Sequence, residues 1–420
     1  MYPRSMNMSG FDLKPCEHQV AGHLFEEGKA GCLVDNRGHF YKPIQPGPRG
    51  DREKEFYERL HLSKEEGLKE YRNGSWNRGY IEAFTSILHG GSYSEAIKSL
   101  LVVTQEQTIS DRRFSSLMSH RCPTFSRQES ILYKGEPKKI NVLQKDESGM
   151  VEWTKIGDEE IIWGDNENDD ATEVSQECGE PPVDFADRID LDSIPEKIKS
   201  LPFLIRHAPL LKAIPKFYKV CSLENRTLLE LEDLARMYSH PCIIDIKIGH
   251  RTWYPDADES YIERCKKKDA NTTQLDLGFK ICGMQVYRHS VGGYWRASKR
   301  WCKTLSKSTI DRALESFVHN ENGLKPMDVY GGPGGVIHQM SLLEEWFAYQ
   351  TEFCFYSSSI LILYEGDAKS SSEANISLRM VDFAHAFSTK NEEQMGRDEN
   401  YLEGLKSFKA HLVRLLSKYF

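Results

Sequence analysis

Two opposite charges interrupt an otherwise apolar stretch, PCIIDIKIG, in which Asp245 and Lys247 alternate with isoleucines. Strand composition favours an extended segment, and its period of two places Asp245 and Lys247 on one face. The opposite face then carries Ile244, Ile246 and Ile248. Gly249 ends the run where a backbone can pass close to a neighbour. Neighbouring acid and base groups can hold a charged reactant, but for a generic strand a half-buried segment with a solvated charged face is the favoured explanation.

A carboxylate and a histidine follow a second strand-like run, RMVDFAHAF, at Asp382 and His385. A carboxylate at a strand end suits a hard Mg²⁺ ion, which takes one or two protein carboxylates together with phosphate oxygens and water. Taken alone, such an aspartate is more often a turn or capping residue, and a lone histidine is more often structural. Asp382 and His385 therefore indicate a functional site only when they are considered together with Asp245 and Lys247.

A lysine in a predicted strand, Lys42 of FYKPIQ, precedes two acids, Glu53 and Glu55, in a predicted helix. A strand lysine held by a helix acid and aimed at phosphates is a recurring device of kinase lobes. Surface charge on both elements is the alternative, and these residues alone do not decide between the two.

A basic helix-like segment, ERCKKKD, carries Arg264, Lys267 and Lys268. On a helix, Arg264 and Lys268 lie four residues apart and share a face, with Lys267 at its edge. Such a face suits a polyphosphate ligand, although a solvated helix or a weak nuclear-import signal has the same composition.

Composition sets wide limits on the class of protein. The 420 residues are 39% hydrophobic and 28% charged with a net charge of −8, which is typical of a globular protein. The longest apolar run, SILILY, is far shorter than a membrane-spanning helix, and the N-terminus has no secretory signal. Ten cysteines without a C-x-x-C pair indicate reduced thiols rather than a zinc site, so we expect a location in the nucleus and cytoplasm.

Other sequence features exclude alternative site types. The glycine-rich YGGPGG lacks the lysine of a phosphate loop and is predicted to lead into a helix. Neither G-x-S-x-G nor H-E-x-x-H occurs, so no hydrolase nucleophile or zinc helix is indicated.

The elements that must position these residues fall into four segments. Residues 1–71 read as strands followed by a helix, and residues 72–200 read as a largely flexible insertion, although two short helices are possible around Gly90. Within the insertion, residues 141–180 hold thirteen acidic residues against two lysines, a composition that usually stays solvated. Residues 201–235 resume the first lobe, and residues 236–420 form the second, ending in an amphipathic helix.

Together these motifs resemble the inositol polyphosphate kinase family. The most specific match is P-x-x-x-D-x-K-x-G at residues 241–249, supported in chain order by HQVAGH, YKPIQPGPRGDREKEFY, LEDL, SSSILILYEG and MVDFAH. Several segments, including VDNRGHFYKP, KIGHRTWYPD and CKKKDANTT, are most similar to plant-type multikinases of this family. The resemblance covers about residues 15–60 and 212–420. It implies an α+β fold of two protein-kinase-like lobes with ATP between them, and the first lobe carries the long acidic insertion.

The resemblance also implies roles for individual residues. Lys42 would contact ATP phosphates, Glu53 would orient the Lys42 side chain, and Asp382 would bind Mg²⁺. Backbone groups of Glu232 and Leu234 would meet adenine. The remaining implied roles concern the inositol phosphate: Asp245 beside the attacking hydroxyl and the nucleotide, Lys247 and His385 near the substrate, and Arg264, Lys267 and Lys268 within the substrate-binding segment 255–275. Ser359 falls in the family's Ser-Leu-Leu region, from which Ile360 departs.

The implied activity is ATP- and Mg²⁺-dependent phosphorylation of inositol 1,4,5-trisphosphate to tetrakis- and pentakisphosphate. About 25 residues separate the signature from LGFKICG, which is room for a short substrate helix rather than a large lid, and an open site suits several substrates. A hexakisphosphate kinase, a trisphosphate 3-kinase, and a regulatory scaffold that contacts proteins through the insertion remain alternatives. We expect a monomer that binds inositol phosphates, with no nucleic acid partner and no transmembrane segment.

Overall fold

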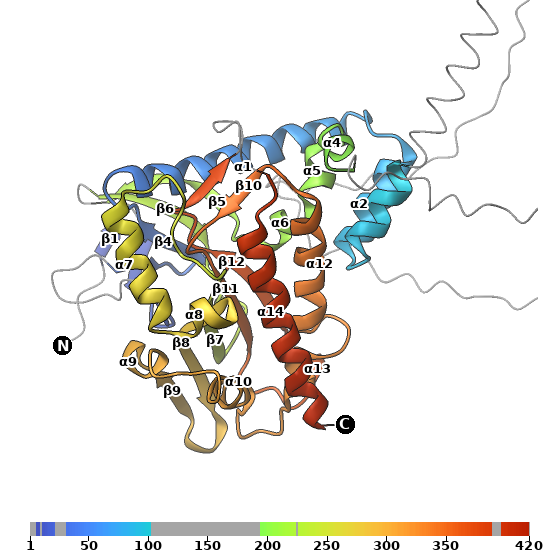
Figure 1. Cartoon of the computed structure of the whole chain (residues 1–420). Helices are drawn as coiled ribbons and strands as arrows, with labels where there is room; N and C mark the ends of the chain where they lie inside the picture. The colour runs from blue at the N-terminus through green and yellow to red at the C-terminus, as the bar shows by residue number, and fades with distance from the viewer. Residues whose placement is uncertain are drawn as a thin grey trace, which may run out of the picture. The chain divides into compact units, whose positions relative to one another are not determined.

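The computed structural model describes residues 6–8, 11–21, 31–101, 194–223, 226–388 and 396–419. They lie within one compact unit that spans Met1–Ser110 and Ile189–Phe420 (Figure 1). Two large antiparallel sheets, one small two-stranded sheet and the helices packed on them form its described part, in agreement with the expected two-lobed α+β fold.

The first sheet has six strands in the order β1-β2-β3-β4-β6-β5. In chain order the strands are β1 (Met6–Met8), β2 (Phe11–Pro15), β3 (Leu33–Val34), β4 (His39–Pro43), β5 (Phe217–Leu223) and β6 (Arg226–Glu232). The long helix α1 (Pro48–Arg72) buries Phe56, Tyr57 and Leu60 on one side. The helix continues through Gly67, where a side chain would come within 2.8 Å of the side chain of Leu204, so the glycine allows the two segments to pack closely.

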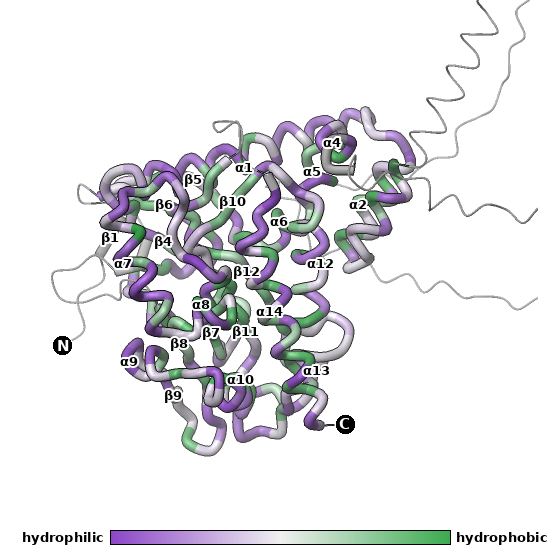
Figure 2. Tube along the Cα trace, in the orientation of Figure 1, coloured by the Kyte–Doolittle hydropathy of each residue, from purple (hydrophilic) through white to green (hydrophobic). Residues whose placement is uncertain are grey.

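The second sheet has five strands in the order β12-β11-β7-β8-β9. Its strands are β7 (Pro241–Ile248), β8 (Phe279–Arg288), β9 (Gly293–Ala297), β11 (Ser359–Glu365) and β12 (Ser377–Val381), and a separate pair joins β10 (Phe353–Phe355) to β13 (Ala386–Ser388). The isoleucines at 244, 246 and 248 are fully buried, as the alternation predicts. The apolar character of these central strands is visible in Figure 2.

Helices cover the second sheet. They are α7 (Glu259–Ala270), α8 (Thr273–Leu277), α9 (Lys299–Cys302), α10 (Ile310–Val318), α11 (Pro326–Tyr330), α12 (Val336–Tyr349), α13 (Ser371–Ala374) and α14 (Glu399–Leu416). Helix α14 runs beside α12 (Figure 1) and begins at the capping carboxylate of Asp398. The start of α14 passes so close to Gly249, at φ +102°, that a side chain there would meet Asn400 at 2.5 Å. The glycine of the signature is thus explained by its positive φ and by the nearby backbone of α14, since a side chain at Gly404 would meet the Gly249 nitrogen at 2.5 Å.

Part of the span expected as an insertion is folded into the core. Helix α2 (Arg78–Leu88), a helical segment at 93–101, and α4 (Ile194–Lys199) lie within residues 72–200. Two further helices, α5 (Phe203–Arg206) and α6 (Ala208–Ala213), follow. Tyr93 is fully buried and donates a hydrogen bond to the carbonyl of Arg206 at 2.8 Å. The packed core therefore continues past Arg72, and the expectation of flexibility concerns residues 102–193, which lie outside the described residues.

Most expected elements are confirmed, including the paired strands β11 and β12, the glycine-rich linker between α11 and α12, and the basic helix α7 between the signature and β8. A second short helix, α8, which was not expected, follows α7. Among the described residues, no helix is both long and apolar enough to span a membrane.

Candidate active site

Lys42 and two carboxylates form an ion-pair clamp between the lobes. Its ammonium group donates hydrogen bonds of 2.7 Å to both Glu53 on α1 and Asp382 after β12. Burial alone would lower the pKa of Lys42, but the charges of Asp382 and Glu53 raise it well above its ordinary value. Glu53 also accepts the backbone N–H of Phe383 at 3.1 Å, so it fixes both the lysine and the turn that carries Asp382. Glu55 is exposed, which identifies Glu53 as the orienting acid.

Asp382 occupies a strained turn at the mouth of this clamp. Its φ of +67° is unusual for a non-glycine residue, and its carbonyl accepts a 2.7 Å hydrogen bond from the buried hydroxyl of Ser358. The side chain remains 45% exposed. The carboxylate is thus held at a defined place while staying accessible to a ligand.

Asp245 is buried beside the clamp, contrary to the solvated-face alternative for β7. Burial and the neighbouring charge of Asp382 raise the pKa of Asp245 to about 6, although Lys247 opposes that shift. Neither Oδ1 of Asp245 nor the hydroxyl of Ser359 has a hydrogen-bond partner of normal geometry among the described residues. Two neighbouring carboxylates, of which Asp382 raises the pKa of Asp245 and Asp245 has an unsatisfied buried oxygen, fit a site for a hard divalent cation.

Lys247 faces a second lysine across the sheet. It pairs in register with Lys280 of β8, and its ammonium donates to the carbonyl of Ser357. The shift in register between Asp245 and Ile246 marks a bulge in this strand pair. Burial lowers the pKa of Lys280, with the charge of Lys247 acting in the same direction. Like charges placed opposite each other are destabilising, so this pair suits an anionic ligand.

His385 lies under an arginine and tyrosine cluster. Its Nε2 is 3.4 Å from the hydroxyl of Tyr261, while Nδ1 is buried without a hydrogen-bond partner among the described residues. Burial, reinforced by the charges of Arg52 and Arg49, lowers the pKa of His385 to about 4. The imidazole is therefore neutral near pH 7. Arg49 lies over the ring of Tyr261, and Arg52 lies over that of Tyr254, at 5.3 and 5.2 Å.

The basic helix contributes less directly than expected. On α7, Cys265 and Asp269 face inward, whereas Arg264, Lys267 and Lys268 are exposed. Lys268 lies near enough to Lys280 to lower its pKa. For Arg264 and Lys267, no hydrogen bond or ion pair within the described ranges leads to Asp245 or Lys247.

The segment LEDL, which ends at Leu234, is where the resemblance places backbone contacts to adenine. The N–H of Glu232, at the end of β6, already donates to Lys216 at 2.8 Å. Within the described ranges, no residue accepts the backbone N–H of Leu234, two residues on.

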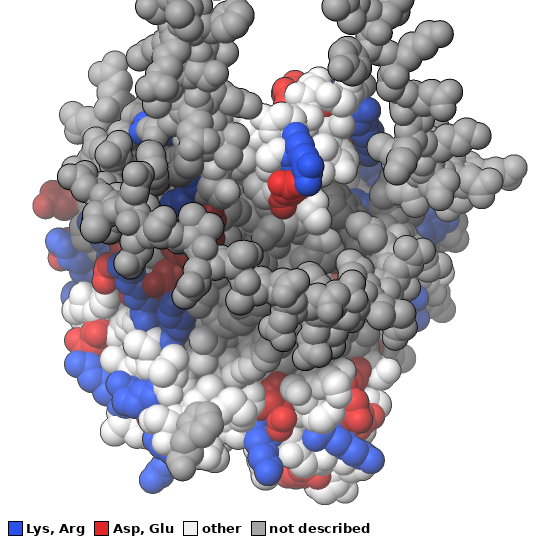
Figure 3. Space-filling view, turned by 90° about the vertical axis from the view of Figure 1, so that its right-hand side faces the viewer, with Lys and Arg blue, Asp and Glu red and all other residues white. Residues whose placement is uncertain are grey.

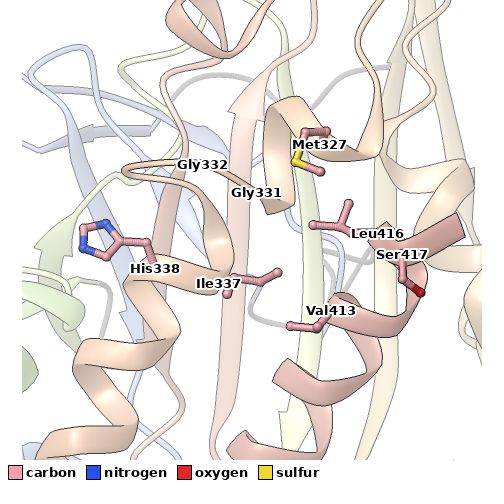
Figure 4. A pocket seen from close by; sticks show the side chains of 8 residues that line it. All are labelled: Met327, Gly331, Gly332, Ile337, His338, Val413, Leu416 and Ser417. Carbon is pink, nitrogen blue, oxygen red and sulfur yellow. The ribbon is translucent and has the colours of Figure 1, made fainter. Parts of the chain in front are cut away.

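Two other surface features do not indicate a phosphate-binding site. The face in Figure 3 intersperses Lys and Arg with Asp and Glu wherever described residues are visible. A pocket between α11, α12 and α14 is lined by Met327, Ile337, Val413 and Leu416, with His338 at its side (Figure 4). Its apolar lining does not suit a phosphate.

Sequence reasoning missed three basic residues of this site. Arg49 and Arg52 stand three apart in PRGDR, the first turns of α1, and Lys280 stands in the strand LGFKICG. The available signal was the alternation of LGFKICG, which aims Lys280 at one face, but only the register shows that it meets Lys247.

Comparison with known proteins supports the resemblance to the inositol polyphosphate kinase family. A family model described as inositol polyphosphate kinase matches residues 228–413. "Inositol polyphosphate multikinase alpha" of Arabidopsis thaliana is 36% identical over 197 residues, covering 44% of this chain and 68% of that protein. "Inositol polyphosphate multikinase beta" of the same plant is 26% identical over 413 residues, covering 94% and 91%.

A solved structure titled as an inositol phosphate multikinase is similar with a TM-score of 0.44 and 32% identity. It covers 54% of this chain and 99% of that one. On the sequence relationships, the chain belongs to the inositol polyphosphate kinase family.

Proposed function

We propose that this protein transfers the terminal phosphoryl group of ATP to inositol 1,4,5-trisphosphate, and then to its tetrakisphosphate product. The observation that carries the proposal is the position of the Lys42–Glu53–Asp382 clamp beside buried Asp245 and the facing lysines at 247 and 280. A phosphate-directed lysine, metal-competent carboxylates and an anion site thus meet at one end of the second sheet. The multikinase names of the two Arabidopsis relatives favour sequential substrates.

The nucleotide and metal would use the clamp. Asp382, with its exposed carboxylate, and Asp245, with its unsatisfied Oδ1, are the groups that would hold Mg²⁺. Bound there, the ion would neutralise phosphate charge during transfer. Lys42 would bind ATP phosphates, and the N–H of Leu234 together with the backbone of Glu232 would position adenine.

The inositol phosphate would meet the cationic side of the site. Lys247 and Lys280 supply fixed positive charge, and Arg49 and Arg52 supply more from the start of α1. Neutral His385 can donate or accept a hydrogen bond at a ring hydroxyl. Ionised Asp245 can accept the proton of the attacking hydroxyl. Phosphoryl transfer needs chiefly this positioning and charge stabilisation.

The decisive experiment incubates purified protein with ATP, Mg²⁺ and inositol 1,4,5-trisphosphate, and follows products by chromatography and phosphorus NMR. We expect tetrakisphosphate and then pentakisphosphate from the wild type, and neither from Asp382→Ala. If tetrakisphosphate accumulates without pentakisphosphate, a trisphosphate 3-kinase is favoured. Turnover of hexakisphosphate alone would favour a hexakisphosphate kinase.

The scaffold alternative is tested in cells. Kinase action predicts that Lys247→Ala and Asp382→Ala fail to rescue a loss-of-function line, whereas a scaffold predicts rescue as good as wild type. A fluorescent fusion in the same line tests the proposed nuclear and cytoplasmic location, and light scattering tests the proposed monomer.

A further inference from the structure

A second polar cluster lies at the far end of the five-stranded sheet. His240 directly precedes β7, Glu365 ends β11, and Asp367 follows two residues later. Because Pro241 pairs with Glu365 while Lys247 pairs with Ser359, the cluster and the proposed catalytic site occupy opposite ends of the same two strands. At about 3.3 Å per residue, roughly 20 Å of strand separates them.

The three side chains converge on one point. One ligand atom from each of His240, Glu365 and Asp367 lies within 4.8 Å of the others. His240 Nδ1 is 2.7 Å from an oxygen of Asp367 and 4.0 Å from one of Glu365. Two ligands of a tetrahedral zinc ion, with bonds near 2.1 Å, stand about 3.4 Å apart, a value that lies between these distances.

A fourth residue completes the set. His289, just after β8, places its Nδ1 3.0 Å from the other oxygen of Asp367. A histidine in this position can either orient a ligating carboxylate or replace a solvent ligand. Three strands of the sheet thereby contribute to one cluster.

The backbone beneath the cluster is firmly held. Buried Asn320 donates to the carbonyls of Gly366 and Ala368 at 2.9 and 2.6 Å, and Asn322 donates to that of Asp367 at 2.6 Å. The ring of His240 stacks on Tyr287 with centroids 4.0 Å apart. The ligand geometry is thus set by the fold rather than by long surface side chains.

Ion pairs within this cluster do not give every polar side-chain atom a hydrogen bond. The ion-pair network explains Asp367, which contacts both histidines, and Glu365, which accepts the backbone N–H groups of Ser239 and His240. The same network brings His240 Nδ1 to 2.7 Å from Asp367, in a contact whose geometry is not that of a hydrogen bond. Buried polar atoms normally have a partner, and a metal ion is one that imidazole nitrogen and carboxylate oxygen would share.

We propose that His240, Glu365 and Asp367, supported by His289, bind a transition-metal ion of the Zn²⁺ class that clips β7, β8 and β11 together. Imidazole ligands favour Zn²⁺ over Mg²⁺ or Ca²⁺, so the site is distinct in chemistry from that of a nucleotide-bound ion. Partial exposure of the side chains, 36% for His240 and 40% for Asp367, leaves a path for entry.

The test titrates the metal-stripped full chain with Co²⁺, whose visible spectrum distinguishes nitrogen and oxygen ligands from thiolates. This distinction matters because the chain has ten cysteines. We expect one bound ion without a thiolate charge-transfer band, displaced by Zn²⁺ but not by millimolar Mg²⁺. Asp367→Asn and His240→Gln should each weaken binding at least about tenfold. The control His89→Gln, at an exposed histidine on α2's C-terminal end, should bind as the wild type does.

Thermal unfolding supplies the second readout. Zn²⁺ should raise the Tm of the wild type and of His89→Gln, but not that of Asp367→Asn, since only proteins that bind the ion gain stability from it. Each variant's kinase activity serves as the check that it is folded. Unchanged Co²⁺ affinity in Asp367→Asn and His240→Gln, a thiolate spectrum in the wild type, or no binding at all would overturn the proposal.

Discussion

Lys280 on β8 stands directly opposite Lys247 on β7, with its side chain only 19% exposed. The nearest carboxylate in an ion pair with Lys280 is Asp269, at 3.9 Å, and this acid is already engaged by the backbone N–H and hydroxyl of Thr252. Burial and Lys247 both lower the pKa of Lys280. An arrangement that is unfavourable in the free protein is explained if both lysines bind phosphate groups of one ligand.

Replacing Lys280 should therefore weaken binding of the inositol phosphate without lowering the stability of the folded protein. We expect Lys280→Gln to raise the KM for inositol 1,4,5-trisphosphate roughly tenfold, because a charged hydrogen bond contributes about 1.5 kcal/mol or more. The KM for ATP should stay unchanged. In ligand-free protein, urea unfolding should show equal or slightly greater stability, since the repulsion is relieved. Lys406→Gln, which removes an exposed lysine paired with Glu403, is the matched control. A selective rise in the KM for ATP would argue against this role.

Replacing Asp245 with asparagine should abolish kinase activity and at the same time stabilise the folded protein. Its pKa is raised from 3.8 to about 6, so the folded state binds the proton more tightly than the unfolded state does. The stability that this proton provides is complete below about pH 4 and is lost as the pH rises through 6. Asp245→Asn should consequently exceed the wild type in stability at pH 7, by up to roughly 3 kcal/mol, and match it near pH 4.

Urea unfolding of the ligand-free proteins at pH 4 and pH 7 measures this difference. Asp256→Asn, at an exposed aspartate, should show no such pH-dependent gain. Equal stability of Asp245→Asn and wild type at both pH values would mean that Asp245 is better solvated than its burial indicates. Because a bound Mg²⁺ would lower the pKa of Asp245, wild-type kinase activity should fall only at a pH below 6.

Local patterns predicted the signature strand well. Alternation alone placed Ile244, Ile246 and Ile248 in the core and paired Asp245 with Lys247 on the other face, because side-chain direction in a strand follows from period two. Gly249 was correctly linked to a close approach, although its neighbour, Asn400, is 151 residues away and no local rule names it.

Contacts between distant segments explain what the sequence did not reveal. Lys280 gains its significance from β-sheet register, and Arg49 and Arg52 gain theirs from packing of α1 over Tyr261 and Tyr254. The hydrophobic residues of α2 were recognised as possible helix, but only their burial against the core shows that the fold continues past Arg72. Helix composition alone does not say whether Glu53 or Glu55 faces Lys42; the resemblance named Glu53, and the hydrogen bond between Glu53 and Lys42 is present in the structure.

His385 should remain neutral across the physiological range. With its pKa lowered to about 4, its imidazole resonance should not titrate between pH 8 and 5.5 in nitrogen-15 NMR of the folded, ligand-free protein. In the urea-unfolded chain the same histidine should titrate near 6.5. His385→Gln identifies the resonance by its disappearance. Added inositol phosphate should raise the pKa, because its negative charge stabilises the imidazolium; a midpoint near 6.5 in the free protein would contradict the buried cationic environment.

Glu53 and Glu55 provide a matched test of the clamp, because they share α1 and differ in what they contact. Glu53 is 1% exposed and binds both Lys42 and the N–H of Phe383, whereas Glu55 is exposed. Glu53→Gln keeps the shape but removes the charge that holds Lys42, so we expect kcat/KM for ATP to fall by about ten- to a hundredfold. The same variant should lose stability by about 1–3 kcal/mol, since Lys42 is left buried with one carboxylate. Glu55→Gln should alter neither quantity. Steady-state kinetics and urea unfolding of the two variants decide the matter: equal effects would mean that the clamp seen between α1 and β4 does not set the position of Lys42 during catalysis.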